Sequence, residues 1–262
     1  MTPRVVGSDL DGTLMRSDGT VSQRSRDAIA AVEAAGCTFV MVTGRPPRWM
    51  RSVAQESGHR GIAVCANGAI VYDLHSDRVL ETFLLPSAVA RDVASALKER
   101  IPGVAFAAEH HERPFAHEQA YVPRWDSGDP RITRTAEELL TDDVVKLLAR
   151  HPTLGPDEFL AKAHEAVGAA CTVTHSSSDG LVEISAAGVS KATGLALVCE
   201  QLQVDAAEVI AFGDMPNDLP MLEWAGTGVA VANAHPSVLA AADEVTGSND
   251  EDGVASYLGR WF

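Results

Sequence analysis

VVGSDLDGT, residues 5–13, is the stretch that decides the fold of this chain. Residues 4–8 are a short, largely apolar run that predicts a buried strand of a parallel sheet. Asp9 and Asp11 follow it directly, and residues two apart in an extended segment point to the same side. Because open α/β sheets bind ligands at the carboxyl ends of their strands, we expect both carboxylates to face a crevice. Taken alone, two turn-forming aspartates beside Gly12 would give the same pattern.

Strand and helix patterns alternate in the first and last thirds of the chain. The pattern predicts strands at 37–42, 62–65, 69–72, 78–84, 208–212 and 228–231, and helices at 22–35, 47–56, 190–202 and 216–224. Ser22 can cap the first of these helices and Gly36 can end it. This alternation indicates a parallel α/β sheet with helices on both faces.

The middle of the chain has a different character. It holds most of the histidines and prolines, and it predicts strands at 104–108, 171–175 and 181–184 with helices at 87–100 and 156–167. We interpret it as a separate α+β module inserted into the α/β domain. The expected domains are residues 1–84 with 187–262, and residues 85–186.

Three further polar groups lie at expected strand ends or helix starts. Thr43-Gly44 offers a hydroxyl and an accessible backbone N–H, although a plain Thr cap fits equally well. Lys191 begins a helix, where its charge opposes the helix dipole unless an anion lies nearby; the alternative is a solvated surface lysine. GDMPND, residues 213–218, is a second acidic strand end, and its alternative is ordinary turn and N-cap chemistry.

Composition excludes several classes of function. The formal net charge is −15, which disfavours binding to nucleic acid and to anionic membranes. No apolar run is long enough to span a bilayer, and we see no signal peptide, so we expect a cytoplasmic protein. The four cysteines, Cys37, Cys65, Cys171 and Cys199, show no C-x-x-C pair and are typical of buried reduced thiols. The P-loop and dinucleotide-binding motifs are missing from the sequence.

Together these motifs resemble the haloacid dehalogenase-like phosphatase superfamily. DLDGT at residues 9–13, Thr43, Lys191 and GDMPND at 213–218 match its four motifs in order. Few residues separate Asp9 from Thr43, whereas a long insertion precedes Lys191. That placement, the NGA at 67–69 and the DGVA at 252–255 resemble the Cof-type (class IIB) branch. The resemblance implies a Rossmann-like core with an inserted α+β cap of the C2B type.

The resemblance also implies a role for each motif residue. Asp9 would be the nucleophile and Asp11 the general acid and base of a phosphatase that forms an aspartyl-phosphate. The implied phosphate-binding residues are Leu10, Thr43, Gly44, Lys191 and Asn217. The implied ligands of Mg²⁺ are Asp9, Asp11 through its backbone carbonyl, and Asp214, with Asp218 supporting them. The substrate would be a small phosphorylated metabolite, such as a sugar phosphate.

Two rival functions stay open at this point. One is a phosphomutase or phosphotransferase that uses the same aspartyl-phosphate, and the other is a catalytically silent binding protein. Candidate specificity residues in the insertion are His110, His111, Arg113, His117, Arg124 and Trp125. A metal site made by the three histidines is an alternative, and Arg45 and Trp49 are candidates for the entrance. We expect a monomer or a homodimer.

Overall fold

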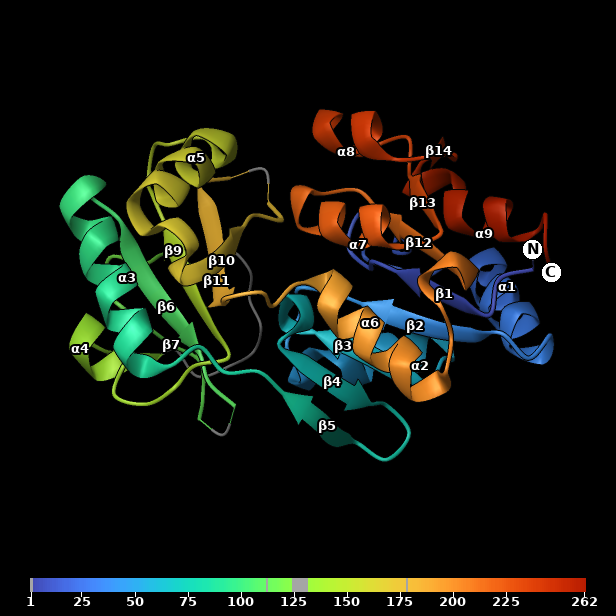
Figure 1. The fold of residues 1–262 in the computed structure, drawn as a ribbon, viewed down its shortest axis with the longest axis horizontal. Coiled ribbons are helices and arrows are strands. Elements are labelled where there is room, and N and C mark those ends of the chain that lie inside the picture. The colour runs from blue at the N-terminus through green and yellow to red at the C-terminus, as the bar shows by residue number, and fades with distance from the viewer. Residues whose placement is uncertain (1, 112, 124–131, 178) are drawn as a thin grey trace. The chain divides into compact units, whose positions relative to one another are not determined.

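The computed structural model of the chain describes residues 2–111, 113–123, 132–177 and 179–262. The chain divides into two compact units, Met1–Glu81 with Ser190–Phe262, and Thr82–Val189. The second unit therefore interrupts the first along the chain (Figure 1).

The first unit is built on an eight-stranded sheet in the order β14-β13-β12-β1-β2-β3-β4-β5. Its strands are β1 (Val5–Ser8), β2 (Thr38–Val42), β3 (Ile62–Cys65), β4 (Ile70–Asp73), β5 (Arg78–Thr82), β12 (Val209–Gly213), β13 (Thr227–Ala230) and β14 (Glu244–Val245). β1 lies between β2 and β12 and runs parallel to both, and all four of its residues are buried. β4 runs antiparallel to β3, at one end of a sheet whose centre is parallel as expected.

Helices cover both faces of this sheet. They are α1 (Gln23–Ala34), α2 (Met50–Ser57), α6 (Lys191–Leu202), α7 (Leu219–Trp224), α8 (Pro236–Ala241) and α9 (Gly253–Leu258). The connection from β1 through α1 to β2 and the connection from β12 through α7 to β13 run outward in opposite directions. Because crossovers between parallel strands are right-handed, α1 and α7 lie on opposite faces of the sheet. α6 packs against α7, and α9 packs against α1. Ser22 accepts a hydrogen bond from the Ser25 N–H, so the expected cap of α1 is confirmed.

The second unit is a six-stranded sheet in the order β10-β11-β9-β6-β7-β8. Its strands are β6 (Ala105–Glu109), β7 (Ala116–His117), β8 (Ile132–Thr133), β9 (Lys146–Arg150), β10 (Cys171–Thr174) and β11 (Leu181–Ala186), and its helices are α3 (Ser87–Arg100), α4 (Ala136–Leu139) and α5 (Pro156–Val167). α3 and α5 pack side by side over an apolar core that includes Leu97, Phe106 and Phe159. The expected α+β character is confirmed, but β9, a central strand, was missing from the prediction.

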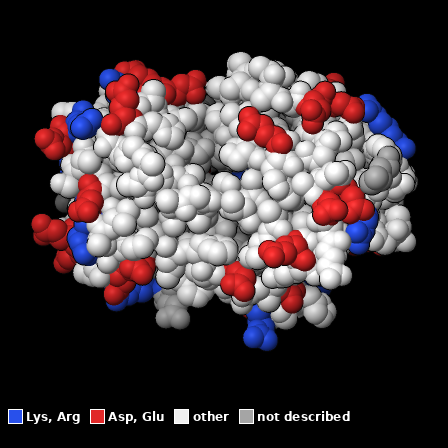
Figure 2. All heavy atoms as spheres, viewed as in Figure 1, with Lys and Arg blue, Asp and Glu red and all other residues white. Residues whose placement is uncertain are grey.

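The burial and charge of side chains agree with the composition. All four cysteines are buried. Within the described residues, no helix combines the length and the apolar character that crossing a membrane requires. On the face drawn in Figure 2, Asp and Glu side chains stand in separate groups with Lys and Arg between some of them. The described residues on that face form no continuous basic patch of the kind that binds nucleic acid.

Candidate active site

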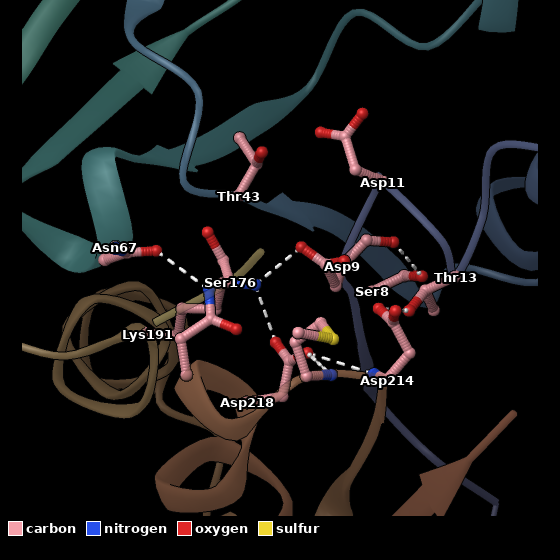
Figure 3. A network of polar contacts seen from close by, with 12 residues as sticks. Ser8, Asp9, Asp11, Thr13, Thr43, Asn67, Ser176, Lys191, Asp214 and Asp218 are labelled. Carbon is pink, nitrogen blue, oxygen red and sulfur yellow. Dashed lines mark hydrogen bonds and ion pairs between the residues drawn. The ribbon is translucent and has the colours of Figure 1, made fainter. Parts of the chain in front are cut away.

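Asp9 lies where β1 ends, at the centre of the first sheet. Its backbone N–H donates to the carbonyl of Phe212 on β12, at 3.0 Å, which fixes the residue between two parallel strands. Its side chain is 7 % exposed, and one carboxylate oxygen accepts a hydrogen bond from Lys191 Nζ at 2.5 Å. Figure 3 shows Asp9 among Thr43, Lys191, Asp214 and Asp218, so the motifs far apart in the sequence meet here.

Lys191 is the first residue of α6 and is buried. Ser190 caps the helix by accepting from the Thr193 N–H, and Thr193 accepts from the Ser190 N–H in return. Lys191 Nζ reaches Asp9 at 2.5 Å and Asp218 at 2.6 Å. The surface-lysine interpretation is therefore wrong. A cation in the first turn of a helix is unfavourable by itself, and here two carboxylates offset that cost.

The charges of this group perturb one another strongly. Burial would lower the pKa of Lys191, but the Asp218 and Asp9 carboxylates outweigh it and hold that pKa above its usual value. Burial raises the pKa of Asp9 well above its usual value; Lys191 opposes the rise, while the Asp218 and Asp214 carboxylates add to it. The lysine therefore compensates only part of the negative charge that these carboxyls carry when ionised.

Asp214 and Asp218 come from the turn after β12. Asp218 Oδ2 accepts from the backbone N–H groups of Asp214 and Met215, both at 3.0 Å. Asp218 therefore holds both this turn and the Lys191 ammonium group in place. Asp214 Oδ1 accepts from the Thr13 hydroxyl at 2.7 Å. Burial, and then the Asp218 carboxylate, raise the pKa of Asp214 to about 6, although the Thr13 hydroxyl acts against them.

Three of these carboxylates form a set that fits a metal ion. Each of Asp9, Asp214 and Asp218 offers an oxygen, and these oxygens lie within 4.8 Å of one another. All three carboxylates are buried, and the raised pKa values of Asp9 and Asp214 mean that the cluster is short of positive charge; oxygen ligands of this kind suit a hard divalent cation. The alternative metal site at His110, His111 and His117 is wrong, since those histidines form no such group within the described residues.

The expected phosphate-binding residues lie in the segments that directly follow β1, β2 and β12 of the first unit, apart from Lys191 at the start of α6. Leu10 lies between the two aspartates and is buried. Thr43 follows β2 directly and is 1 % exposed, and its hydroxyl accepts from the Arg45 N–H at 3.1 Å. Gly44 lies between Thr43 and Arg45. Asn217 is 4 % exposed, on the turn that also carries Asp214 and Asp218.

Asp11 is placed differently from Asp9. Its side chain is 58 % exposed and forms two hydrogen bonds with the Arg45 guanidinium, at 2.5 and 2.8 Å. In Figure 3 its carboxylate points away from Asp214 and Asp218. The side chain therefore lies outside the carboxylate cluster, on the open side of the site, where it can meet a substrate. Sequence reasoning considered Arg45 for the entrance and missed this ion pair, because nothing in the spacing of the two residues signals it.

A loop after β13 ties the two acidic turns together, and sequence reasoning missed it. Asn233 Nδ2 donates to the Gly12 carbonyl at 2.8 Å, and the His235 N–H donates to the Asp214 carbonyl at 2.7 Å. Gly12 has a φ of +81°, and a Cβ built on it would lie 2.4 Å from Asp214 Oδ2. The close approach of the two acidic turns therefore requires glycine at residue 12.

The candidate specificity residues lie in the second unit. His110 and His117 are buried, while His111 and Arg113 are exposed, and Arg113 forms an ion pair with Asp142. Arg124 and Trp125 lie outside the described residues.

Comparisons with known proteins agree with this site. Residues 6–258 match the haloacid dehalogenase-like hydrolase family. The chain is 32 % identical to the pyridoxal phosphate phosphatase YbhA of Escherichia coli (strain K12), over 98 % of both chains. It is 29 % identical to the 5-amino-6-(5-phospho-D-ribitylamino)uracil phosphatase YitU of Bacillus subtilis (strain 168), over 99 % of this chain and 98 % of the relative.

The fold is also similar to those of solved structures. The chain superposes with a TM-score of 0.83 on BT4131, a sugar phosphatase of HAD subclass IIB, at 22 % identity over 98 % of both chains. The family match spans nearly the whole sequence, and the first relative covers all of it but a few residues. The chain thus belongs to the haloacid dehalogenase-like hydrolase family and has the fold of its subclass IIB members.

Proposed function

We propose that this protein is a phosphatase that hydrolyses small phosphorylated metabolites through an aspartyl-phosphate on Asp9. The observation that carries the proposal is the buried group in which Lys191 joins Asp9 to Asp218 beside Asp214. The relatives named above act on pyridoxal phosphate and on a phosphoribitylamino uracil, and both are phosphate esters of small molecules. Phosphatases of this family are metal-dependent, which agrees with the carboxylate set.

Magnesium is the cofactor that this set suits best. Asp9 and Asp214 would hold the ion through side-chain oxygens and Asp11 through its backbone carbonyl, while Asp218 keeps Lys191 and the Asp214 turn in place. A phosphate dianion beside ionised carboxylates is repelled by about 4 kcal/mol for each pair of unit charges 4 Å apart at an effective dielectric near 20. The bound ion would supply the positive charge that offsets this repulsion.

Asp9 and Asp11 would share the chemistry. An Asp9 carboxylate oxygen attacks the phosphorus in line, the bond to the leaving oxygen breaks, and Asp11 gives that oxygen its proton. A water molecule then attacks the phosphorus of the aspartyl-phosphate, giving its proton to Asp11 and releasing inorganic phosphate and the Asp9 carboxylate. The exposure of Asp11 suits a group that meets the leaving group, and its side chain must leave Arg45 to do so.

The remaining motif residues would hold the non-bridging oxygens of the phosphoryl group. Lys191 supplies a buried positive charge, and the Thr43 hydroxyl and the backbone of Leu10 and Gly44 supply donors around Asp9. The rigid positions of these donors favour the transition state, in which charge spreads over those oxygens. The second unit would act as the cap that selects the leaving group.

A phosphate-release screen tests the proposal. The panel contains pyridoxal phosphate, the phosphoribitylamino uracil, several sugar phosphates and p-nitrophenyl phosphate, each with Mg²⁺ and with excess EDTA. We expect release only with Mg²⁺, and we expect Asp9→Asn to abolish it while the circular dichroism spectrum stays the same. Near-normal turnover by Asp9→Asn would overturn the role of the nucleophile, and full release in EDTA would overturn the metal. Conversion to a second phosphorylated product would instead indicate a mutase.

A further inference from the structure

The turn after β3 has an unusual backbone. Ala66, Asn67 and Gly68 all have positive φ values, of 51°, 58° and 100°. Residues other than glycine adopt this left-handed conformation only at a cost, and such strain gathers at sites that use it. Two of the three residues are not glycine, so the surrounding structure must hold the turn in place.

Contacts on both sides hold this turn at the candidate active site. The Asn67 N–H donates to the Thr43 carbonyl at 3.0 Å, and the Ala66 N–H donates to the Arg45 carbonyl at 2.9 Å. On its other side the turn presses against α6, since a Cβ built on Gly68 would lie 1.9 Å from the Ser190 carbonyl oxygen. The turn is thus wedged between the residue after β2 and the helix start that carries Lys191.

The side chain that this turn presents is a buried carboxamide. Asn67 is 3 % exposed, and its Oδ1 accepts from Asn217 Nδ2 at 3.0 Å. Asn67 Nδ2 and Asn217 Oδ1 are also buried, and neither has a hydrogen-bond partner among the described residues. Turning both carboxamides over exchanges the atoms but still leaves one NH2 group and one oxygen without a partner.

An unpartnered buried amide is costly, and a ligand can satisfy it. Figure 3 shows the Asn67 side chain directed toward the space between Thr43 and Lys191, the two residues expected to hold phosphate. An NH2 group is a donor, and it suits an anionic oxygen there. One N–H of the Asn217 amide, the group that sequence reasoning assigned to phosphate, donates to Asn67 Oδ1.

We propose that Asn67 is a further substrate-binding residue, whose NH2 group donates to a non-bridging phosphoryl oxygen, and that Asn217 is a positioning residue that orients it. The strained turn after β3 then places the Asn67 NH2 group beside the phosphate. This inference rests on the proposed phosphatase function and adds a ligand from outside the four motifs.

Asn67→Gly is the central test, because glycine adopts a positive φ freely and keeps the turn. Removing the Asn67 side chain also removes the acceptor of Asn217 Nδ2, so we expect the melting temperature to fall about as far as in Asn217→Ala, while kcat/KM for p-nitrophenyl phosphate falls roughly 10- to 100-fold. The inhibition constant for inorganic phosphate should rise as well. Asn67→Asp keeps the size and the tolerance for positive φ but replaces the donor with an anion, so it should lose still more.

Gln203→Gly is the matched control. Gln203 also has a positive φ, of 55°, but it is an exposed residue at the far end of α6. This variant should be at least as stable as the wild type and keep kcat/KM and the phosphate inhibition constant. Asn217→Ala should lose about as much activity as Asn67→Gly, and the double variant should lose no more than either, because both changes remove the same donor.

The outcomes separate this inference from the proposed function. If the wild type releases no phosphate from any substrate, the proposed function fails. If the wild type is active and Asn67→Gly stays within twofold of Gln203→Gly in both constants, the role of Asn67 is overturned. A loss of activity in Asn67→Gly that comes with an unfolded circular dichroism spectrum at the assay temperature would make Asn67 a residue of the fold and would also overturn it.

Discussion

Lys191→Met removes the only protein cation that contacts the buried carboxylates Asp9 and Asp218 among the described residues. Methionine has nearly the length of lysine and packs well, so the change removes charge with little change in volume. Asp218 is fully buried and Asp9 is 5 % exposed, so the change leaves both carboxylates without this counter-charge and with little access to water. We therefore expect a large loss of stability in the absence of metal.

The magnitude follows from the burial of the pair. Removing one partner of a buried ion pair costs about 3 to 5 kcal/mol. For a protein of this size, 1 kcal/mol lowers the melting temperature by about 2 to 4 °C, so the expected fall is roughly 6 to 20 °C. A divalent cation at 100 times its dissociation constant returns about 2.7 kcal/mol, because it binds the folded carboxylates and not the unfolded chain.

Thermal unfolding followed by tryptophan fluorescence measures this effect, in EDTA and in Mg²⁺. Arg51→Met is the control, since it replaces a cation in the same unit by methionine. Arg51 pairs with Asp77 on the surface, with side chains 74 % and 57 % exposed, so its loss should cost only about 0 to 1 kcal/mol. The reasoning is refuted if Lys191→Met melts in EDTA within 2 °C of Arg51→Met, roughly the shift expected for 1 kcal/mol.

Three further changes test other parts of the structure. Gly12→Ala should raise the Mg²⁺ concentration for half-maximal phosphate release at least about tenfold, because the new Cβ meets the Asp214 carboxylate. A titration of phosphate release with Mg²⁺ measures this midpoint, and an unchanged midpoint would contradict the prediction. Asn233→Ala should lower the unfolding free energy by about 0.5 to 1.5 kcal/mol and slow turnover, as urea unfolding and initial rates will show. Burial raises the pKa of Cys37 to about 11, so less of this thiol is ionised at pH 8 than in the unfolded chain. Labelling of Cys37 by a thiol reagent should therefore be roughly 200-fold slower in the native protein than in guanidinium, and fast labelling of the native protein would argue against burial.

The order of elements in the first unit was predictable because its signals are local. The run before Asp9 forms β1, the 62–65 run forms β3, and Ser22 caps α1 as expected. The sequence pattern does not predict β9, because the residues at both ends of this strand are charged. Lys146 and Arg150 are both buried, and Lys146 Nζ pairs with Glu183 on β11 at 2.5 Å, so a polar strand end is neutralised by a partner 37 residues away. No pattern within β9 itself reveals that partner.

The site was predictable as far as its motif residues. Asp9, Lys191, Asp214 and Asp218 do come together, because each sits at a strand end or helix start on one edge of the sheet. The contacts that orient them depend on side-chain directions across the sheet. Asn67 and Asn217 lie 150 residues apart, and neither their spacing nor their composition predicts that they meet.

The insertion of the second unit has a consequence for the synthesis of this protein. β1 and β2 are made early, but β12, which pairs with the other edge of β1, follows only after about 100 inserted residues. At ribosomal rates of about 5 to 20 residues per second, the roughly 200 residues from β1 to β12 take about 10 to 40 s, and β1 waits that long for this neighbour. Until then an apolar strand of the nascent chain has an open edge, which is the kind of segment that chaperones bind. A similar stretch, 182 residues, separates Asp9 from the lysine that pairs with it, so the site can form only late in synthesis.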